Sequence, residues 1–157
     1  MKTKNFRAYL GAMAENLVIS DLLKNGFLPH TPLVNNCPYD ILVTKGSIRF
    51  RVQVKYRSIQ RGAVEVTMRR HTNSGYEDYK DTYDILALVT DGGLIAYLHR
   101  EEIGRSVCLR ITRSKNNQTK HVKKFNKYKC INAAIIRARD KSDSRLGKES
   151  TRNKERS

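Results

Sequence analysis

The strongest pattern along the chain is a strict alternation of apolar and polar residues over Ile48–Arg57. A period of two is typical of a β-strand that is buried on one face. The alternation directs five apolar side chains toward a core: Ile48, Phe50, Val52, Val54 and Tyr56. The opposite face carries Arg49, Arg51, Gln53, Lys55 and Arg57. A strand with such a cationic second face is suited to lie over a polyanion.

A short hairpin is predicted immediately before this strand. The apolar run Ile41–Thr44 follows Asp40, and the link Lys45–Ser47 is short enough to fold the run back antiparallel onto the next strand. The fold-back brings Asp40 toward the far end of that strand, where Gln53 and Lys55 lie. An acid, an amide and an ammonium group therefore converge at one place.

Residues 4–25 are predicted to form a helix, because apolar residues recur there at helical spacing. Asn5 or Thr3 can cap its start, and Gly26 is a fitting C-terminal stop. Glu15 has no charged neighbour three or four residues away on this helix. A buried Glu without a partner is costly, so Glu15 either lies at a wet helix rim or serves a site elsewhere; we favour the site.

Further strands are expected over residues 63–68, 84–90, 94–99 and 106–111. The middle two form a hairpin across Asp91-Gly92-Gly93. Residues 69–82 are polar and rich in turn formers, which favours a long loop or a short helical turn. Prolines keep residues 29–38 from becoming helical.

The composition changes after residue 112. Residues 113–129 are dense in Lys, Asn and Gln, and their apolar anchors, spaced by three, are typical of one helix face: Val122, Phe125 and Tyr128. A helix is predicted over residues 131–139. The chain beyond residue 140 is charged and nearly free of apolar residues, which favours disorder. We therefore divide the chain into a core (1–111), a basic accessory segment (112–140) and a disordered charged tail (141–157).

The chain has 157 residues, a formal net charge of +16 and a pI near 10.0. This excess implies a polyanionic partner, and no apolar run is long enough to favour a membrane instead. Three cysteines and four histidines are scattered without ligand spacing, which argues against a disulfide framework or a zinc ribbon. We expect a cytoplasmic protein that is associated with the nucleoid when it acts.

Two short motifs together resemble the PD-(D/E)XK nuclease superfamily. Pro38-Tyr39-Asp40 corresponds to the family's Pro-Asp with one residue inserted, and Gln53-Val54-Lys55 corresponds to its Glu-x-Lys. Gln at the second position departs from the commonest pattern and resembles the variant in group I intron-encoded homing endonucleases. The order of elements also agrees, from the helical Gly11–Glu15 to the strand Tyr83–Leu88.

This resemblance implies an α/β fold of the α+β type: a restriction-endonuclease-like core with a mixed central sheet, flanking helices and a basic C-terminal extension. It implies a Mg²⁺-dependent (or Mn²⁺-dependent) endodeoxyribonuclease without a small-molecule cofactor. The catalytic residues would be Glu15, Asp40, Gln53 and Lys55. The cation would bind Asp40, Gln53, the carbonyl of Val54 and Glu15, and Lys55 would orient or activate the attacking water.

Each of these residues also has a purely structural interpretation. Asp40 is of a type that often forms a turn at the start of a strand, Lys55 is one of several cations on an exposed face, and an exposed strand Gln is ordinary. The match to the motif favours catalysis. The candidate DNA contacts are Arg49, Arg51, Arg57, Arg69, Arg70, His71, Lys115, Lys120, Lys123 and Lys124, with plain solvation as their alternative.

The leading functional hypothesis is a site-specific endonuclease acting on double-stranded DNA, of the intron homing type. A Holliday-junction resolvase, a restriction-type nuclease and a non-catalytic basic RNA- or DNA-binding protein are the alternatives. One site per chain cuts one strand, so we expect at least a homodimer, with a dimer of dimers possible. Two apolar faces are available for it, unless they pack within the chain: Val122/Phe125/Tyr128 and Ile131/Ala134/Ile135.

Overall fold

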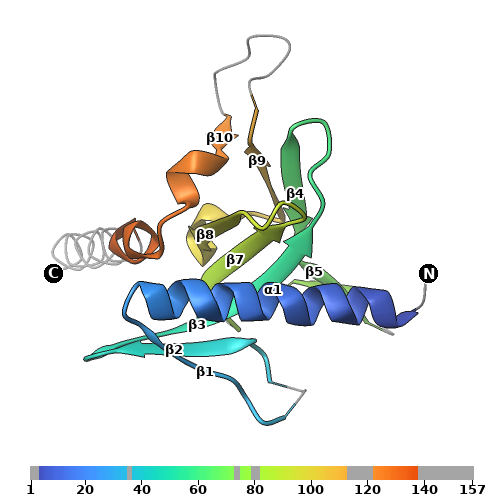
Figure 1. The fold of residues 1–157 in the computed structure, drawn as a ribbon. Coiled ribbons are helices and arrows are strands. Elements are labelled where there is room, and N and C mark those ends of the chain that lie inside the picture. Colours follow the sequence, from blue (N-terminus) through green and yellow to red (C-terminus); the bar gives the residue numbers. More distant parts are fainter. Residues whose placement is uncertain (1–3, 35–36, 73–74, 79–81, 113–121, 138–157) are drawn as a thin grey trace, which may run out of the picture.

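The computed structural model describes residues 4–34, 37–72, 75–78, 82–112 and 122–137 (Figure 1). The chain begins with one long helix, α1 (Lys4–Lys24), as predicted. It ends in a Schellman motif, in which Gly26 has φ 75° and its amide donates to the carbonyl of Leu23. The amide of Phe27 donates to the carbonyl of Leu22. Glycine is required here because other residues adopt this left-handed conformation at a cost.

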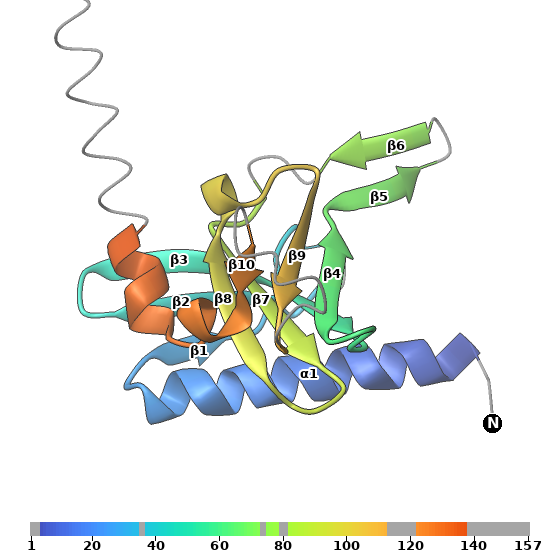
Figure 2. The same cartoon turned by 90° about the horizontal axis from the view of Figure 1, so that it is seen from above.

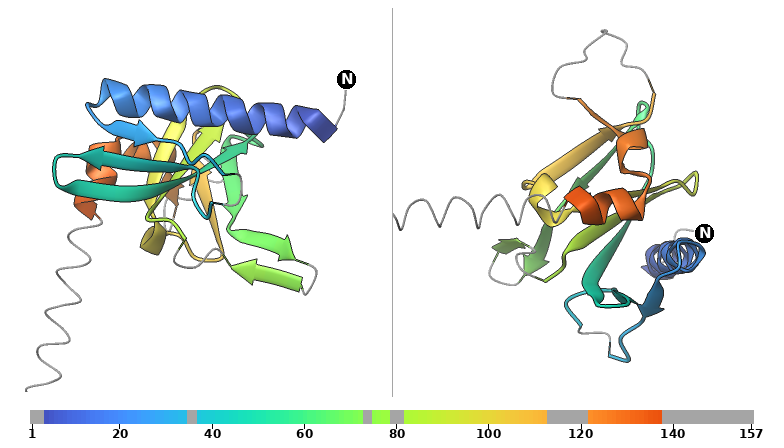
Figure 3. Two further views of the ribbon diagram at one scale, coloured as in Figure 1. Left: turned by 90° about the horizontal axis from the view of Figure 1, so that it is seen from below. Right: turned by 90° about the vertical axis from the view of Figure 1, so that its left-hand side faces the viewer.

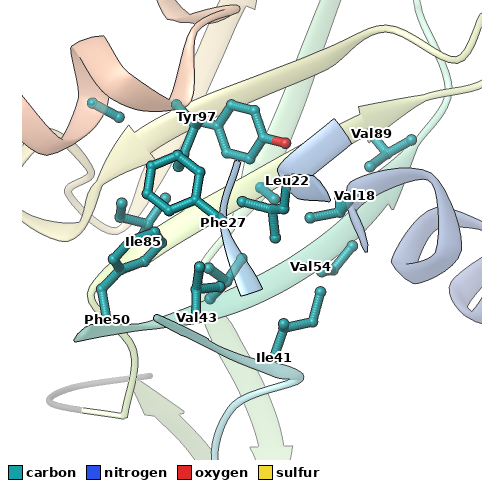
Figure 4. Packing of buried hydrophobic residues seen from close by; sticks show 14 of the residues in the cluster. Val18, Leu22, Phe27, Ile41, Val43, Phe50, Val54, Ile85, Val89 and Tyr97 are labelled. Carbon is teal, nitrogen blue, oxygen red and sulfur yellow. The ribbon is translucent and has the colours of Figure 1, made fainter. Parts of the chain in front are cut away.

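A five-stranded mixed sheet lies against α1. Its strand order is β1-β2-β3-β7-β8, and only β3 and β7 run parallel. The bounds are β1 (Leu28–His30), β2 (Ile41–Lys45), β3 (Ile48–Arg57), β7 (Ile85–Thr90) and β8 (Ile95–His99). The predicted hairpins β2–β3 and β7–β8 are therefore confirmed. Apolar residues of α1 and the sheet fill the space between them (Figure 4).

A second, smaller sheet covers the opposite face of β7 and β8 (Figure 2). It has the order β10-β9-β4 and comprises β4 (Ala63–Thr67), β9 (Ser106–Arg110) and β10 (Lys123–Lys124). Every residue of β7 is buried, because the strand has one core on each side. A continuous apolar run without alternation is what such a doubly covered strand requires.

Residues 69–72 and 75–78 form two paired strands, so the loop or helical turn predicted for residues 69–82 is wrong for these residues, and residues 73–74 and 79–81 lie outside the described part of the chain. Strands β5 (Arg69–Thr72) and β6 (Gly75–Asp78) pair antiparallel and make a separate two-stranded sheet. The hairpin extends away from the main body of the protein beyond β4 (Figure 3). Its sequence is polar and shows no apolar alternation, so the strands are defined by their cross-strand pairing.

The segment 122–137 packs back onto the main body. The one helix face predicted from Val122, Phe125 and Tyr128 is replaced by β10 and a 3₁₀ turn, η2 (Phe125–Tyr128). Residues 131–137 are helical as predicted, and Ala138 and Arg139 lie outside the described residues. Phe125, Ile131 and Ala134 are buried in the two cores, so both proposed oligomer faces are used mainly within the chain.

Arg137 fixes the end of this segment. Its Nε donates to Glu102 Oε1 at 2.9 Å, and its Nη2 donates to the carbonyl of Tyr97 at 3.0 Å. Glu102 belongs to a 3₁₀ turn, η1 (Arg100–Glu102), directly after β8. No helix in the described part of the chain is long and apolar enough to cross a membrane.

Candidate active site

The β2–β3 hairpin joins Asp40 to Gln53, as its short turn predicts. Ile41 pairs with Val52 across the hairpin, and the amide of Asp40 donates to the carbonyl of Val52 at 3.0 Å. The carboxylate Oδ2 of Asp40 accepts from the amide of Val54 at 2.6 Å and from Nε2 of Gln53. Gln53 is buried, at 7% exposure, so this polar pair is shielded from water on the β3 side.

Glu15 and Lys55 act on the same carboxylate through their charges. Burial raises the pKa of Asp40, and the amide of Val54 and the ammonium of Lys55 oppose that rise. Burial likewise raises the pKa of Glu15, and the negative charge of Asp40 raises it further. Helix α1 therefore supplies a second carboxylate near the hairpin, and all four residues predicted for the site belong to one electrostatic cluster.

The oxygen atoms of this cluster suit a hard divalent cation. Two carboxylates with raised pKa values, an amide oxygen and a backbone carbonyl are ligands that Mg²⁺ accepts, and a cation between the carboxylates would relieve their repulsion. In the described residues no group of three or more His, Cys, Asp or Glu side chains could hold a metal. A cation at this place would therefore need an oxygen from Gln53 or the backbone as well, and Gln53 could supply one only if its amide turned so that oxygen replaced the donating NH₂.

A cationic cleft of about 1250 Å³ continues from this cluster. Val54 and Lys55 are among the residues that line it, and α1, the end of β3, β4 and β9 form its walls. Four arginines contribute to the lining: Arg7, Arg57, Arg61 and Arg110. Glu65 is the one carboxylate among the residues that line it. The cleft has the charge and position to bind a phosphate backbone beside the cluster.

The sequence reasoning missed Arg7, Arg61 and Arg110. They come from α1, the β3–β4 connection and β9, and no local pattern links them; only the tertiary fold gathers them. Arg61 adopts a left-handed conformation with φ 50°. The following Gly62 leaves no room for a side chain, because a Cβ there would lie 1.9 Å from Oγ1 of Thr112. This tight turn fixes one wall of the cleft.

The predicted DNA contacts differ in their surroundings. Arg49, Arg57 and Lys124 are exposed. Nζ of Lys123 donates to the carbonyl of Glu102. Residues 69–71 lie on β5 of the extended hairpin, and Lys115 and Lys120 lie outside the described residues.

Arg51 has a structural partner in Asp84, directly before β7, the strand next to its own. Its Nη2 donates to Oδ1 of Asp84 at 2.9 Å, and its Nε donates to Oδ2 at 3.1 Å. The backbone amide of Arg51 also donates to Oδ2 at 2.7 Å, and the amide of Asp84 returns a bond to the carbonyl of Arg51. Burial alone would raise the pKa of Asp84, but these hydrogen bonds from Arg51 outweigh it and lower the pKa.

The mixed sheet with its hairpin-borne acid and lysine defines a nuclease of the PD-(D/E)XK class. The chain belongs to the PD-(D/E)XK endonuclease family, whose sequence model it matches over residues 2–131. The family assignment predicted from Asp40 and Gln53-Val54-Lys55 is thus confirmed. Members of this family are DNA endonucleases that generally use divalent metal ions. The chain is therefore an endonuclease that hydrolyses DNA.

Two known proteins are similar to the chain. "Protein 5.3" of Escherichia phage T7 is 31% identical over 108 residues, which cover 67% of this chain and 92% of that protein. The structure of the bacterial homing endonuclease I-Ssp6803I matches with a TM-score of 0.66 at 19% identity. That match covers 88% of this chain and 97% of the other. It confirms the predicted fold.

Proposed function

We propose that the protein is a metal-dependent, site-specific endonuclease that cleaves double-stranded DNA, with the properties of an intron homing endonuclease. The observation that carries this proposal is the contact of Asp40 with Gln53 and Val54, near the charges of Glu15 and Lys55, beside a cationic cleft that Val54 and Lys55 line. The fold it shares with a bacterial homing endonuclease supports the homing type.

Asp40, Glu15, Gln53 and the carbonyl of Val54 would hold Mg²⁺ or Mn²⁺. When bound, the cation would supply charge neutralisation at the scissile phosphate and would lower the pKa of a bound water molecule. Lys55 would orient the attacking water and offset charge in the transition state. The glutamine leaves the ligand set one negative charge poorer than a Glu-x-Lys site, and Glu15 restores it.

The DNA backbone would follow the cleft. Arg7, Arg57, Arg61 and Arg110 would contact phosphates there, and Arg49, exposed near the β2–β3 turn, would contact the backbone outside the cleft. The β5–β6 hairpin has the form of a two-stranded ribbon that fits a major groove, which is where base edges are read. We place Arg69, Arg70 and His71 in this role. Arg51 is mainly a structural residue, because Asp84 occupies its guanidinium group.

Cleavage of plasmid DNA tests the proposal. The chain should cut a supercoiled plasmid library with Mg²⁺ and not with EDTA. Asp40→Asn and Lys55→Met should each abolish cutting yet still bind DNA, because neither residue is the main source of affinity. Lys127→Met removes an equal charge at an exposed position outside the cleft and is the matched control. Cutting by Asp40→Asn at the wild-type rate would show that the active site is misplaced.

Binding and substrate choice separate the alternatives. Affinity should fall steeply with salt, since phosphate contacts release counterions. Preferred cutting of four-way junctions over linear duplex would point to a resolvase, and binding without any cutting would point to a non-catalytic protein. Selection of cleaved sites from a randomised duplex library would show whether a long, homing-type target is recognised.

A further inference from the structure

Helix α1 is apolar on two opposite sides. One side is fully buried against the sheet through Ala14, Val18 and Leu22. The outward side exposes Phe6 (53%), Tyr9 (77%), Met13 (41%) and Leu17 (36%) to solvent. A helix of a soluble protein normally keeps its outward side polar, and a helix that is apolar all round is normally buried all round. We call these four residues, together with the half-buried Leu10, the α1 stripe.

The α1 stripe lacks charge in a chain that is rich in it. From Phe6 to Ser20 the exposed residues of the outward side are apolar apart from Asn16 and Ser20, which are neutral. The amide of Asn16 is satisfied by the carbonyl of Ala12 in the same helix at 3.0 Å. No described segment lies over this side of α1, which forms the rim of the molecule (Figure 2). The stripe offers no charged group to pair with a charged partner, so binding of nucleic acid there would have no favourable electrostatic contribution.

The spacing of the stripe is symmetric. Its seam residues Phe6, Leu10, Met13 and Leu17 are separated by four, three and four positions, which reads the same from either end. An antiparallel copy of α1 would set Phe6 opposite Leu17 and Leu10 opposite Met13. Self-complementarity of this kind is what a two-fold interface requires, and the four-three spacing is that of paired helices.

We propose that the α1 stripe binds the same stripe of a second copy of this chain, antiparallel and about a two-fold axis near the midpoint of Leu10 and Met13. The choice of a second copy, and not another protein, rests on the proposed function, since two copies supply the two sites that a double-strand break needs. The chain's own tail is a poor occupant, because residues 138–157 contain a single large apolar residue, Leu146.

The size and position of the stripe agree with this pairing. From Phe6 to Leu17 it is roughly 17 Å long at 1.5 Å per residue. Its exposed apolar surface is on the order of a few hundred Å², the size at which such patches mark interaction sites. Arg7 and Gly11 on the adjoining side of α1 line the cleft, as does Leu10 at the edge of the stripe, so pairing through the stripe places the two clefts on either side of the two-fold axis.

Sedimentation equilibrium of the full chain without DNA tests the pairing at micromolar concentration. The wild type should have twice the 18.1 kDa mass of one chain. Met13→Glu should weaken self-association by about tenfold or more, because it buries two charges near the axis. Leu33→Glu places the same charge on a fully exposed apolar residue elsewhere and should leave association unchanged. A monomeric wild type, or equal association of both variants, would overturn the proposal.

A mixing experiment tests the antiparallel orientation. Phe6→Glu alone and Leu17→Lys alone should each weaken self-association. An equimolar mixture of the two proteins should restore a dimer, because antiparallel pairing sets the new carboxylate at position 6 of one chain against the new ammonium group at position 17 of the other. A parallel pairing brings each position together with itself, so failure of the mixture to dimerise would overturn the antiparallel arrangement. Circular dichroism establishes that each variant retains its fold.

Nuclease assays distinguish failure of this proposal from failure of the proposed function. If both hold, Met13→Glu should nick supercoiled plasmid but lose most linear product, whereas Leu33→Glu should give the wild-type products. Dimerisation that depends on the stripe in a chain without any nuclease activity would support the interface and reject the nuclease. Full linearisation by a monomeric Met13→Glu protein would reject the interface and keep the nuclease.

Discussion

Two aspartates flank strand β3 in similar positions and have opposite properties. Asp40 precedes β2 on one side of β3, and Asp84 precedes β7 on the other. Each accepts a hydrogen bond from a β3 amide and donates its own amide back to a β3 carbonyl. Yet the pKa of Asp40 is raised, mainly by burial, whereas hydrogen bonds from Arg51 lower the pKa of Asp84 against its burial.

The difference lies in what each carboxylate faces. The guanidinium group of Arg51 donates a hydrogen bond to each carboxylate oxygen of Asp84. This bidentate ion pair already balances the negative charge of Asp84, so a metal cation is not required there. Asp40 contacts two neutral amides, from Gln53 and Val54. The charge of Lys55 nearby does not outweigh the effect of the burial of Asp40, while the carboxylate of Glu15 adds a second negative charge close by. The same backbone arrangement thus produces a structural clamp on one side of β3 and a candidate metal ligand on the other.

The largest expected contrast is in activity. Asp40→Asn should reduce cleavage by about 10³-fold or more, because it removes the carboxylate that anchors the cation. Asp84→Asn is the same chemical change on the other side of β3 and should keep activity within about tenfold of wild type. Single-turnover cleavage rates with Mg²⁺ measure both. Comparable losses in the two variants would mean that Asp84 also takes part in the chemistry.

The second-largest effect on the cleavage rate is expected at Gln53, which contacts Asp40. Gln53→Leu should lower cleavage by about 10- to 100-fold, because it removes an oxygen ligand. Gln53→Glu should retain part of the activity, since a carboxylate oxygen has the same reach. Metal titration of the cleavage rate should show a higher Mg²⁺ requirement for the leucine variant. Equal activity of all three proteins would make Gln53 a bystander.

Stability should respond to Asp84 in a pH-dependent way. Because its pKa is lowered in the folded state, the clamp stabilises the fold above the usual value of 3.8, and the contribution is lost as pH falls through the lowered pKa. Asp84→Asn should cost about 1 kcal/mol at neutral pH, a modest size because solvent screens a pair exposed by more than a third. Urea denaturation at neutral and acidic pH should show the difference shrinking.

The smallest expected effect is on stability at Glu15, where a substitution should stabilise the fold, whereas Asp84→Asn should destabilise it. The raised pKa of Glu15 means that its charge destabilises the fold, so the penalty is absent below its usual pKa of 4.5 and grows as pH rises through the raised value. With EDTA present, Glu15→Gln should therefore stabilise the protein at neutral pH by about 0.5 kcal/mol after solvent screening. A thermal melt with no gain would show that Glu15 is well hydrated.

The local parts of the site could be predicted because neighbouring residues encode them. Alternation along β3, a three-residue link and a preceding aspartate were sufficient to place Asp40 beside Gln53. The helix, its glycine stop and the β7–β8 hairpin follow from equally local signals. The catalytic roles of these residues stay predictions, as does the division of the chain at residue 111.

The parts that depend on distant pairing could not be predicted. The parallel pairing of β3 with β7 brings Arg51 to Asp84, so a residue expected on DNA became half of a clamp. The second sheet gathers Arg61 and Arg110 into the cleft from separate segments. The β5–β6 hairpin could not be predicted because its sequence is polar and shows no apolar alternation, and Phe125 belongs to a core that only the folded chain creates.

The short loop between Asp40 and Gln53 has a consequence for folding. These residues are 13 positions apart, whereas Arg51 and Asp84 are separated by 33 and the Asp21–Tyr97 hydrogen bond by 76. Hairpins of this length form within microseconds, far ahead of contacts between distant segments. We therefore expect three of the four proposed ligands, Asp40, Gln53 and the carbonyl of Val54, to assemble before the helix docks, and Glu15 to join them only when α1 packs against the sheet.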